Sequence, residues 1–218
     1  MASPAKPEIL LLSLSMQSYL DELYSPLIDE LSSKATLKRA KSASGAITYL
    51  SANTPRAIIA TDEGLTKSAN ASVLQKVLAY VKEGGLLIIG LHFPSFINMD
   101  VFDKFFNKLG LPWKHGDYHR TTFRFNPACT LPSGLSSTSF PAPYSMKVLH
   151  VKGARAQEKI FVPVPEATTQ SAVFAPAYVD QAQAAVVGAK IGDGYVFYDG
   201  NVNPEEGQIR VISALCGL

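Results

Sequence analysis

Apolar residues occur along the chain in two patterns, short uninterrupted runs and runs with helical spacing. The uninterrupted runs predict buried strands at residues 8–14, 46–50, 56–60 and 86–89. Helical spacing predicts amphipathic helices at residues 17–31, 72–83 and 98–110, the first of them bent or divided at Pro26. Strands that alternate with helices are typical of a parallel sheet with helices on both faces.

The pattern changes after Pro112. Short strands separated by turns, without helices between them, predict an antiparallel extension of the sheet. These strands are expected at residues 121–125, 147–151, 159–164, 172–175, 184–191 and 194–200. A last helix begins near Pro204. The sequence therefore predicts a three-layer α/β sandwich in which antiparallel strands are added to a mostly parallel sheet in the C-terminal half. We expect residues 1–218 to form one domain.

Composition narrows the function classes. Hydrophobic residues make up 47% and charged residues 17% of the 218 residues, and the formal net charge is +2. The basic cluster at residues 34–41 is expected to cap a helix end and border a loop, so we predict no nucleic-acid partner. No apolar run is long enough for a signal peptide core or a membrane span. The two cysteines, Cys129 and Cys216, have no metal or redox spacing, which fits a reducing compartment. We therefore expect a cytoplasmic protein.

Candidate chemistry gathers where three predicted strands end. Asp62 and Glu63 follow one strand, His92 follows the strand at residues 86–89, and residues 199–205 follow the last strand. Carboxyl ends of parallel strands meet at one sheet edge, which is where α/β proteins build their sites. His92 is a candidate base or nucleophile partner, with a backbone-bonded ring as the alternative. Asp62 and Glu63 fit helix caps better than substrate-orienting groups.

Other candidate sites are weaker. His115, Asp117 and His119 could bind a metal together with His92 or Glu63, but a solvated loop fits these short pairs better, so no metal is predicted. The chain has no phosphate-cradling glycine loop after its first strand, and no cofactor is expected. The cysteines have no histidine placed to activate them.

Four aromatic residues lie in the irregular middle of the chain. They could line a sugar-sized pocket, or they could cover the edge of the sheet, which fits each of them better taken singly. The four are Trp113, Tyr118, Phe123 and Tyr144.

Two motifs in this order of elements resemble the class I glutamine amidotransferase-like superfamily, which has a flavodoxin-like fold. Gly90-Leu91-His92 stands where catalytic members have Gly-x-Cys, and Asn203-Pro204-Glu205 stands where they have His-Pro-Glu. The resemblance implies a degenerate triad, with His92 in place of the cysteine, Asn203 in place of the histidine, and Glu205 retained. Thioester chemistry needs the thiol and its base, so this alignment excludes glutamine hydrolysis by the Cys-His-Glu mechanism.

Within that superfamily the chain is most similar to the trehalose-utilisation (ThuA-like) branch. The similarity lies in Gly84-Gly85 followed by Gly90-Leu91-His92, and in the late strand Gly192-Asp193-Gly194-Tyr195-Val196-Phe197-Tyr198. Chemistry in that branch is poorly defined and related at best to sugar metabolism.

Three functions follow from this resemblance. The first is a non-glutaminase protein that binds a small polar, sugar-like molecule at the carboxyl edge of the sheet, with Glu63, Asn203 and Tyr198 as binding residues. The second is a structural or interaction protein with a retired site, that is, one whose former active site is filled by side chains. Such a protein would act through its surface or through a homodimer interface. The third is a hydrolase or lyase in which His92 acts with Glu205 or Glu63. We expect the first, with a small-molecule ligand and no membrane partner.

Overall fold

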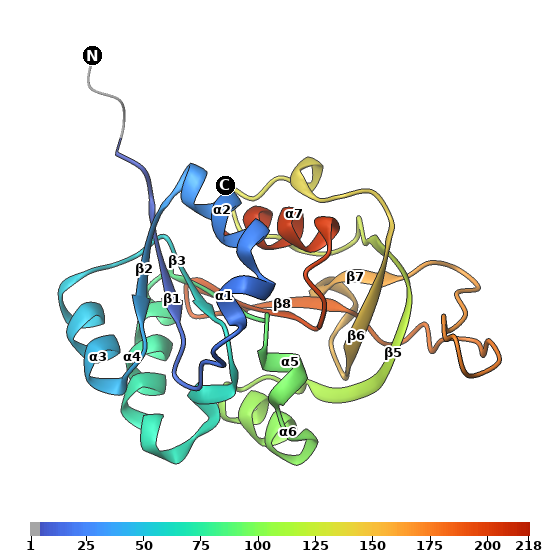
Figure 1. Ribbon diagram of the computed structural model, residues 1–218, viewed down its shortest axis with the longest axis horizontal. Coiled ribbons are helices and arrows are strands. Elements are labelled where there is room, and N and C mark those ends of the chain that lie inside the picture. The colour runs from blue at the N-terminus through green and yellow to red at the C-terminus, as the bar shows by residue number, and fades with distance from the viewer. Residues whose placement is uncertain (1–4) are drawn as a thin grey trace.

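A nine-stranded sheet runs through the computed structural model, which describes residues 5–218 (Figure 1). Its strand order is β2-β1-β3-β4-β9-β8-β7-β5-β6. The strands from β2 to β9 in this order are parallel, and those from β9 to β6 pair antiparallel. The strands span Glu8–Leu12 (β1), Thr36–Ala40 (β2), Ala57–Ala60 (β3), Leu86–Ile89 (β4), Lys114–Phe125 (β5), Tyr144–Lys152 (β6), Lys159–Pro163 (β7), Val186–Ile191 (β8) and Gly194–Asp199 (β9). The predicted mixed α/β sheet is confirmed.

Helices cover both faces of this sheet. In Figure 1, α1, α2 and α7 lie on one side of the sheet, and α3, α4 and α6 lie on the other. The helices span Leu20–Leu23 (α1), Ser25–Lys34 (α2), Ala43–Ala52 (α3), Ala71–Lys82 (α4), Phe93–Phe96 (α5), Met99–Lys108 (α6) and Glu206–Leu215 (α7). The helix predicted for residues 17–31 is divided, as expected, because α1 ends at Leu23 and Pro26 lies in the first turn of α2.

The sheet separates two apolar cores. Side chains of a strand point alternately to its two faces, so Leu10 and Leu12 pack with α4 and α6, whereas Ile9 and Leu11 pack with α2 and α7. All four residues of β3 and of β4 are buried. This burial on both faces explains why both strands appear in the sequence as uninterrupted apolar runs.

Two elements in the N-terminal half differ from the prediction. Residues 46–50 form part of helix α3 rather than a strand. Ser42 caps this helix by accepting a hydrogen bond from the Gly45 N–H at 3.2 Å. The second strand is instead β2, which carries Lys38 and Arg39 and lies at the sheet edge, where charged side chains reach water. Lys34 of this basic cluster lies in the last turn of α2, as predicted, whereas Lys38 and Arg39 lie in a strand rather than beside a loop.

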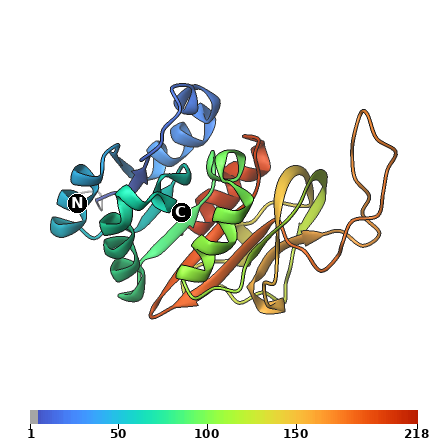
Figure 2. The ribbon, with the colours of Figure 1, turned by 90° about the horizontal axis from the view of Figure 1, so that it is seen from below.

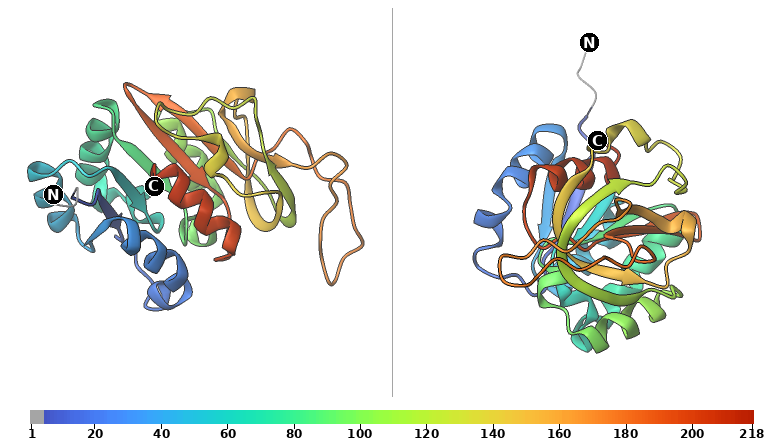
Figure 3. Two further views of the ribbon diagram at one scale, coloured as in Figure 1. Left: turned by 90° about the horizontal axis from the view of Figure 1, so that it is seen from above. Right: turned by 90° about the vertical axis from the view of Figure 1, so that its right-hand side faces the viewer.

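The C-terminal half adds the antiparallel strands. Five of the six predicted strands are present, but residues 172–175 are not a strand. They belong to the connection between β7 and β8, which projects from one end of the molecule (Figures 2 and 3). We call residues 164–183 the arm. Within the described residues 5–218, none of the helices has the length and apolar character to cross a membrane.

Candidate functional site at the carboxyl edge of the sheet

Three adjacent parallel strands bring the predicted groups to one edge of the sheet. β3 pairs with β4 in the register Ala60↔Ile89, and β4 pairs with β9 in the register Ile89↔Tyr198. The residues after these strands therefore lie side by side, as predicted. They supply two acidic groups after β3, the imidazole after β4 and the residues 199–205 after β9.

His92 follows a sharp turn at the end of β4. Leu91 has a φ of 57°, a left-handed conformation that is uncommon for a non-glycine residue. The His92 N–H donates to the Thr61 carbonyl at 3.0 Å, which ties the turn to the end of β3. The backbone of His92 is thus fixed, whereas its ring nitrogens have no hydrogen-bond partner within residues 5–218.

Three aromatic rings surround the His92 side chain. The ring centroids of Tyr19, Tyr24 and Phe96 lie 5.1, 5.4 and 5.3 Å from that of His92. The residue is 2% exposed. This burial lowers the pKa of His92, although the negative charge of Glu63 acts in the opposite direction. The imidazole is therefore neutral near pH 7, with one nitrogen able to donate and the other able to accept.

The two acidic residues after β3 have different environments. Asp62 caps the short 3₁₀ turn Glu63–Thr66, and its Oδ1 accepts from the N–H groups of Gly64 at 2.9 Å and Ser15 at 3.0 Å. Burial raises the pKa of Asp62 and these bonds lower it. Glu63 pairs through Oε1 with Lys67 Nζ at 3.1 Å, while its Oε2 is buried without a partner within the described chain. The predicted cap role is therefore that of Asp62, and one oxygen of Glu63 is uncommitted.

Asp199, at the end of β9, is fully buried behind this edge. Its Oδ2 accepts from Gln208 Nε2 at 2.9 Å, and its Oδ1 accepts from the Asn201 N–H at 3.1 Å. Burial raises the pKa of Asp199 to about 6. The pKa of Tyr24 is also raised, first by burial and then by the charge of Asp199. The Tyr24 hydroxyl is itself buried without a hydrogen-bond partner within residues 5–218.

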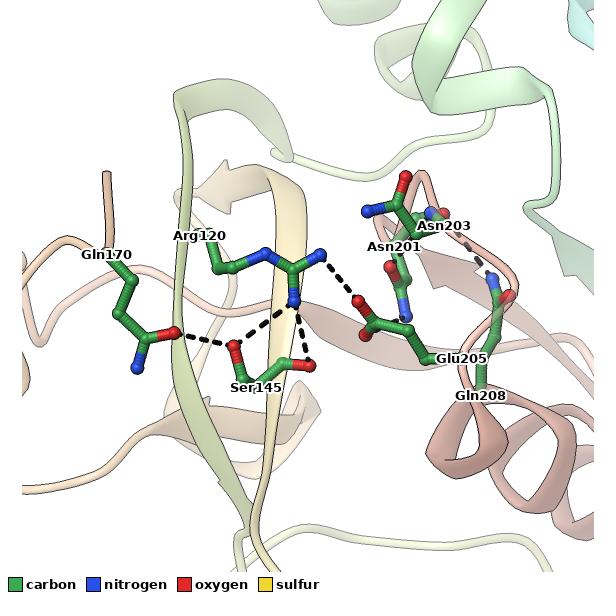
Figure 4. Close-up of polar contacts among 7 residues, drawn as sticks. All are labelled: Arg120, Ser145, Gln170, Asn201, Asn203, Glu205 and Gln208. Atoms are coloured by element: carbon green, nitrogen blue, oxygen red, sulfur yellow. Dashed lines mark hydrogen bonds and ion pairs between the residues drawn. The ribbon is translucent and has the colours of Figure 1, made fainter. Parts of the chain in front are cut away.

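Glu205 is paired with Arg120 of β5. Its Oε1 lies 2.6 Å from Nη2 of Arg120, and Arg120 Nη1 donates to Ser145 Oγ at 3.2 Å (Figure 4). The Ser145 hydroxyl in turn donates to Gln170 Oε1 at 2.6 Å. With its amide oxygen turned toward Arg120, Asn203 accepts from the same Nη2 at 2.7 Å. Glu205 and Asn203 thus belong to a network around Arg120, and the structure does not bring Glu205 and His92 together.

Tyr198 lies in the core rather than at the edge. It is fully buried, its hydroxyl donates to the Leu149 carbonyl at 3.0 Å, and its ring packs edge-on against Phe102 at a centroid distance of 5.2 Å. No atom of its side chain reaches the surface in this conformation. In this conformation Tyr198 therefore cannot make the ligand contact at the carboxyl edge that the sequence predicts.

The aromatic residues of the middle segment divide between core and surface. Trp113 and Phe123 are buried, and Trp113 Nε1 donates to Glu158 Oε2 at 3.0 Å. Tyr144 is partly buried, and Tyr118 is 48% exposed. Tyr118 is thus the one exposed residue of the four.

The predicted His and Asp pairs have partners of their own. His115 Nδ1 lies 2.9 Å from Asp103 Oδ1, and Asp117 Oδ1 lies 3.3 Å from Lys152 Nζ. His119 stacks on His150, with 4.3 Å between ring centroids. Within residues 5–218, no three His, Cys, Asp or Glu side chains gather in a metal-binding arrangement.

Neither cysteine lies at the turn after β4. Cys216 is buried at the end of α7, where burial raises the pKa of its thiol to about 12. Cys129 follows β5 and is half-buried, and burial raises the pKa of this thiol as well. Both thiols are poor nucleophiles at neutral pH.

Several residues of this site gave no signal in the sequence. Arg120 lies in a strand whose pairing is antiparallel, and its partner Glu205 is 85 residues away. Tyr24 lies between two short helices and Ser15 in the loop after β1, and neither forms part of a motif. The one available signal was the break in helical spacing at Pro26, which places Tyr24 at a helix boundary.

Comparison with known proteins supports the fold. No protein-family model matches the sequence, and no curated protein matches it. A solved protein from Parabacteroides merdae that is described as ThuA-like is similar with a TM-score of 0.56 at 12% identity, over 97% of this chain and 88% of that chain. A cytoplasmic protein from Salmonella typhimurium LT2 gives 0.51 at 12% identity, over 96% and 95%. The predicted resemblance to ThuA-like proteins is thus confirmed at the level of the fold alone.

A third similar structure is a β-galactosidase from the haloarchaeon Halorubrum lacusprofundi. Its TM-score is 0.52 at 14% identity, over 99% of this chain. The match covers 31% of that enzyme, so this chain spans less than a third of its length.

Proposed function

We propose that this chain is a non-glutaminase protein of the glutamine amidotransferase-like superfamily that binds a small polar, sugar-like molecule at the carboxyl edge of the sheet. The ThuA-like fold of its structural neighbour supports the first part of this proposal. The turn after β4, which holds Leu91 and His92 and no thiol, supports the absence of glutaminase chemistry. We also propose that the protein is cytoplasmic, because the spacing of its two cysteines fits a reducing compartment.

Buried polar atoms without hydrogen-bond partners near the end of β4 support the proposed ligand binding. Both ring nitrogens of His92, Oε2 of Glu63 and the hydroxyls of Tyr24 and Ser15 are buried without a hydrogen-bond partner within residues 5–218. Each such atom costs about 1–3 kcal/mol, so native proteins rarely keep several together. A molecule rich in hydroxyl groups would both donate to and accept from this set.

The cover over His92 fits reversible entry. Tyr19 and Phe96 close over the imidazole, yet they are 46% and 41% exposed. Because neither ring is held in the core, turning one aside loses little apolar burial. Their faces would then pack on the apolar face of a sugar ring while its hydroxyls reach His92 and Glu63.

Thermal denaturation with a ligand panel tests this function. Trehalose, glucose and galactose are compared with glutamine and simple esters, using the wild type, His92→Phe and Glu63→Gln. A ligand that binds only the folded state raises the melting temperature, so we expect a sugar to raise it in the wild type and to have no effect in either variant. Glu30→Gln on the exposed side of α2 is the matched control. If no sugar shifts the wild type, or if His92→Phe responds equally, the proposal is wrong.

A retired site in a structural or interaction protein is the second candidate. The observation in its favour is the close packing of three aromatic rings around His92. On this hypothesis no panel compound shifts the wild type, and the exposed side chains of Tyr19, Leu23, Phe96 and Met99 form a contact surface. Sedimentation velocity would then detect a homodimer that Phe96→Glu dissociates.

A hydrolase or lyase that uses His92 is the third candidate. Glu63 is the carboxylate whose charge reaches His92, whereas Glu205 is paired with Arg120. If His92 is a general base, Glu63 is therefore the carboxylate that acts with it. Unchanged ester turnover in His92→Ala would rule out that role.

A further inference from the structure

A cleft lies at the β5–β6 hairpin, beside the residues that link Arg120 to Glu205. Its volume is about 550 Å³, within the range of small-molecule sites. β5 and β6 form its floor and the arm forms its wall, and we call it the hairpin cleft. The residues that matter to its chemistry are Tyr118, Arg120, Lys147, Gln170 and Phe174.

The wall of the hairpin cleft is fixed by hydrogen bonds. The Gln170 N–H donates to the Arg120 carbonyl at 2.8 Å, and Gln170 Nε2 donates to Thr122 Oγ1 at 3.0 Å. The Thr121 hydroxyl donates to the Thr168 carbonyl at 2.8 Å. Because these bonds join the base of the arm to β5, the cleft is a built feature of the fold.

The hairpin cleft carries one uncompensated positive charge. Arg120 and Lys147 are directly paired across β5 and β6, an arrangement that like charges disfavour. Glu205 neutralises Arg120. Lys147 forms no ion pair within residues 5–218, and none of the described residues lining the cleft is Asp or Glu.

Aromatic surface lies next to that charge. Lys147 Nζ lies 5.0 Å from the centroid of the Tyr118 ring, which is 48% exposed. Phe174, on the arm, is 76% exposed. Both rings line the same cleft, and apolar surface that gathers in one place marks an interaction site.

We propose that the hairpin cleft binds a small monocarboxylate that carries an aromatic ring. The carboxylate pairs with Lys147, and the ring packs against Tyr118 and Phe174. One net positive charge matches a monocarboxylate better than a dianionic phosphate, because the forked guanidinium that suits phosphate is already bound to Glu205 and Ser145.

Calorimetric titration of the full chain tests the proposal. The probes are phenylacetate and 4-hydroxyphenylacetate, and 2-phenylethanol is the neutral analogue of the first. We expect both carboxylates to bind at least tenfold more tightly than the alcohol, with affinity that falls as salt is raised. Lys147→Met keeps the side-chain stem over Tyr118 and should lower carboxylate affinity at least tenfold.

Controls separate charge at the cleft from charge in general. Lys38→Met removes an exposed lysine from β2, at the opposite edge of the sheet, and should leave the affinity unchanged. The melting temperature of each variant establishes that it is folded. Equal affinity for phenylacetate and 2-phenylethanol, no binding of either carboxylate at millimolar concentration, or full affinity in Lys147→Met would each overturn the proposal. Sugar binding at His92 is measured separately and is unaffected by any of these outcomes.

Discussion

Arg120 and Glu205 form an ion pair that joins β5 to the N-cap residue of α7. Nη2 and Oε1 are 2.6 Å apart, and the two side chains are 31% and 24% exposed. Arg120 also donates through Nη1 to the Ser145 carbonyl and hydroxyl. Half-buried, charge-assisted contacts of this kind contribute more than surface pairs. The pair therefore gives Glu205 a structural partner in place of a catalytic one.

A double-mutant cycle on this pair measures that contribution. We expect Arg120→Met and Glu205→Gln each to lower the free energy of unfolding, with a coupling of about 1–2 kcal/mol, since the two side chains share one network. Urea denaturation provides the measurement. The exposed pair Lys34–Glu30 on α2, at 2.6 Å, is the control and should couple by about 0.3–0.5 kcal/mol. Equal coupling in the two cycles would contradict the structural role of Glu205.

Substitution of His92 separates its packing from its polarity. His92→Phe keeps an aromatic ring among Tyr19, Tyr24 and Phe96 and removes two buried unpartnered nitrogens, so we expect it to raise the free energy of unfolding by about 1 kcal/mol in the absence of ligand. His92→Ala leaves a cavity and should lower it by about 2–4 kcal/mol. Loss of stability in His92→Phe would show that the nitrogens have partners in solution.

The same substitution changes the response to acid. Burial lowers the pKa of His92 in the folded state, so below about pH 6.5 the unfolded chain binds more protons than the folded chain at this residue. Protonation of His92 in the unfolded chain therefore lowers the free energy of unfolding as the pH falls below that value. We expect the gain from His92→Phe to be larger at pH 5 than at pH 7.5, as urea titrations at both pH values can establish. A gain independent of pH would contradict the lowered pKa.

The convergence of groups at the carboxyl edge could be predicted because it depends on local features. β3, β4 and β9 are uninterrupted apolar runs, and the polar residues that follow such strands must meet at one edge. The Arg120–Glu205 pair could not be predicted in this way. It depends on the order and register of antiparallel strands from β9 to β6, which turns and loops of variable length determine.

Secondary structure was misassigned where composition outweighed periodicity. Residues 46–50 are β-branched and aromatic enough to resemble a strand, yet Ser42 begins a helix there. The reverse error concerns β2, whose Lys38 and Arg39 reduce the apolar signal of an edge strand. Both errors leave the number of parallel strands unchanged, which is why the predicted fold class is correct although one strand was misplaced.

Asp199 gives the protein a second pH response of opposite sign. Its pKa is about 6 in the folded state because it is buried, above the usual value near 3.8. The folded state therefore binds more protons at this residue between those values, and the resulting stability is lost as the pH rises through 6. We expect a loss of about 1 kcal/mol between pH 5 and pH 8 from this group.

Asp199→Asn isolates that response. Its free energy of unfolding relative to the wild type should rise by about 1 kcal/mol between pH 5 and pH 8, because only the wild type must ionise a buried group. Urea titrations at several pH values provide the measurement. Asp193→Asn, in the exposed turn between β8 and β9, controls for loss of a carboxylate and should show no such trend. A constant difference for Asp199→Asn would mean that the carboxyl group ionises normally.

Gly194 sets the alignment of β9 against β4 on which the carboxyl edge depends. A Cβ at this residue would collide with the carbonyl oxygens of Gly85 and Val81, both of them backbone atoms that cannot turn aside. The next residue, Tyr195, donates its N–H to the same Gly85 carbonyl at 3.1 Å, so the close approach begins the pairing of the two strands. We expect Gly194→Ala to lower the free energy of unfolding by about 1–3 kcal/mol.

Gly45→Ala is the matched control for that substitution. Gly45 lies inside α3, where alanine favours the helix by about 1 kcal/mol and its Cβ meets only the Ser42 hydroxyl at 3.2 Å. We expect this variant to be as stable as the wild type or slightly more so in urea. Because the β4–β9 pairing helps to align the residues that follow these two strands, Gly194→Ala should also weaken the sugar binding proposed for the carboxyl edge. Normal stability in Gly194→Ala would mean that β4 and β9 can separate at their first residues without loss.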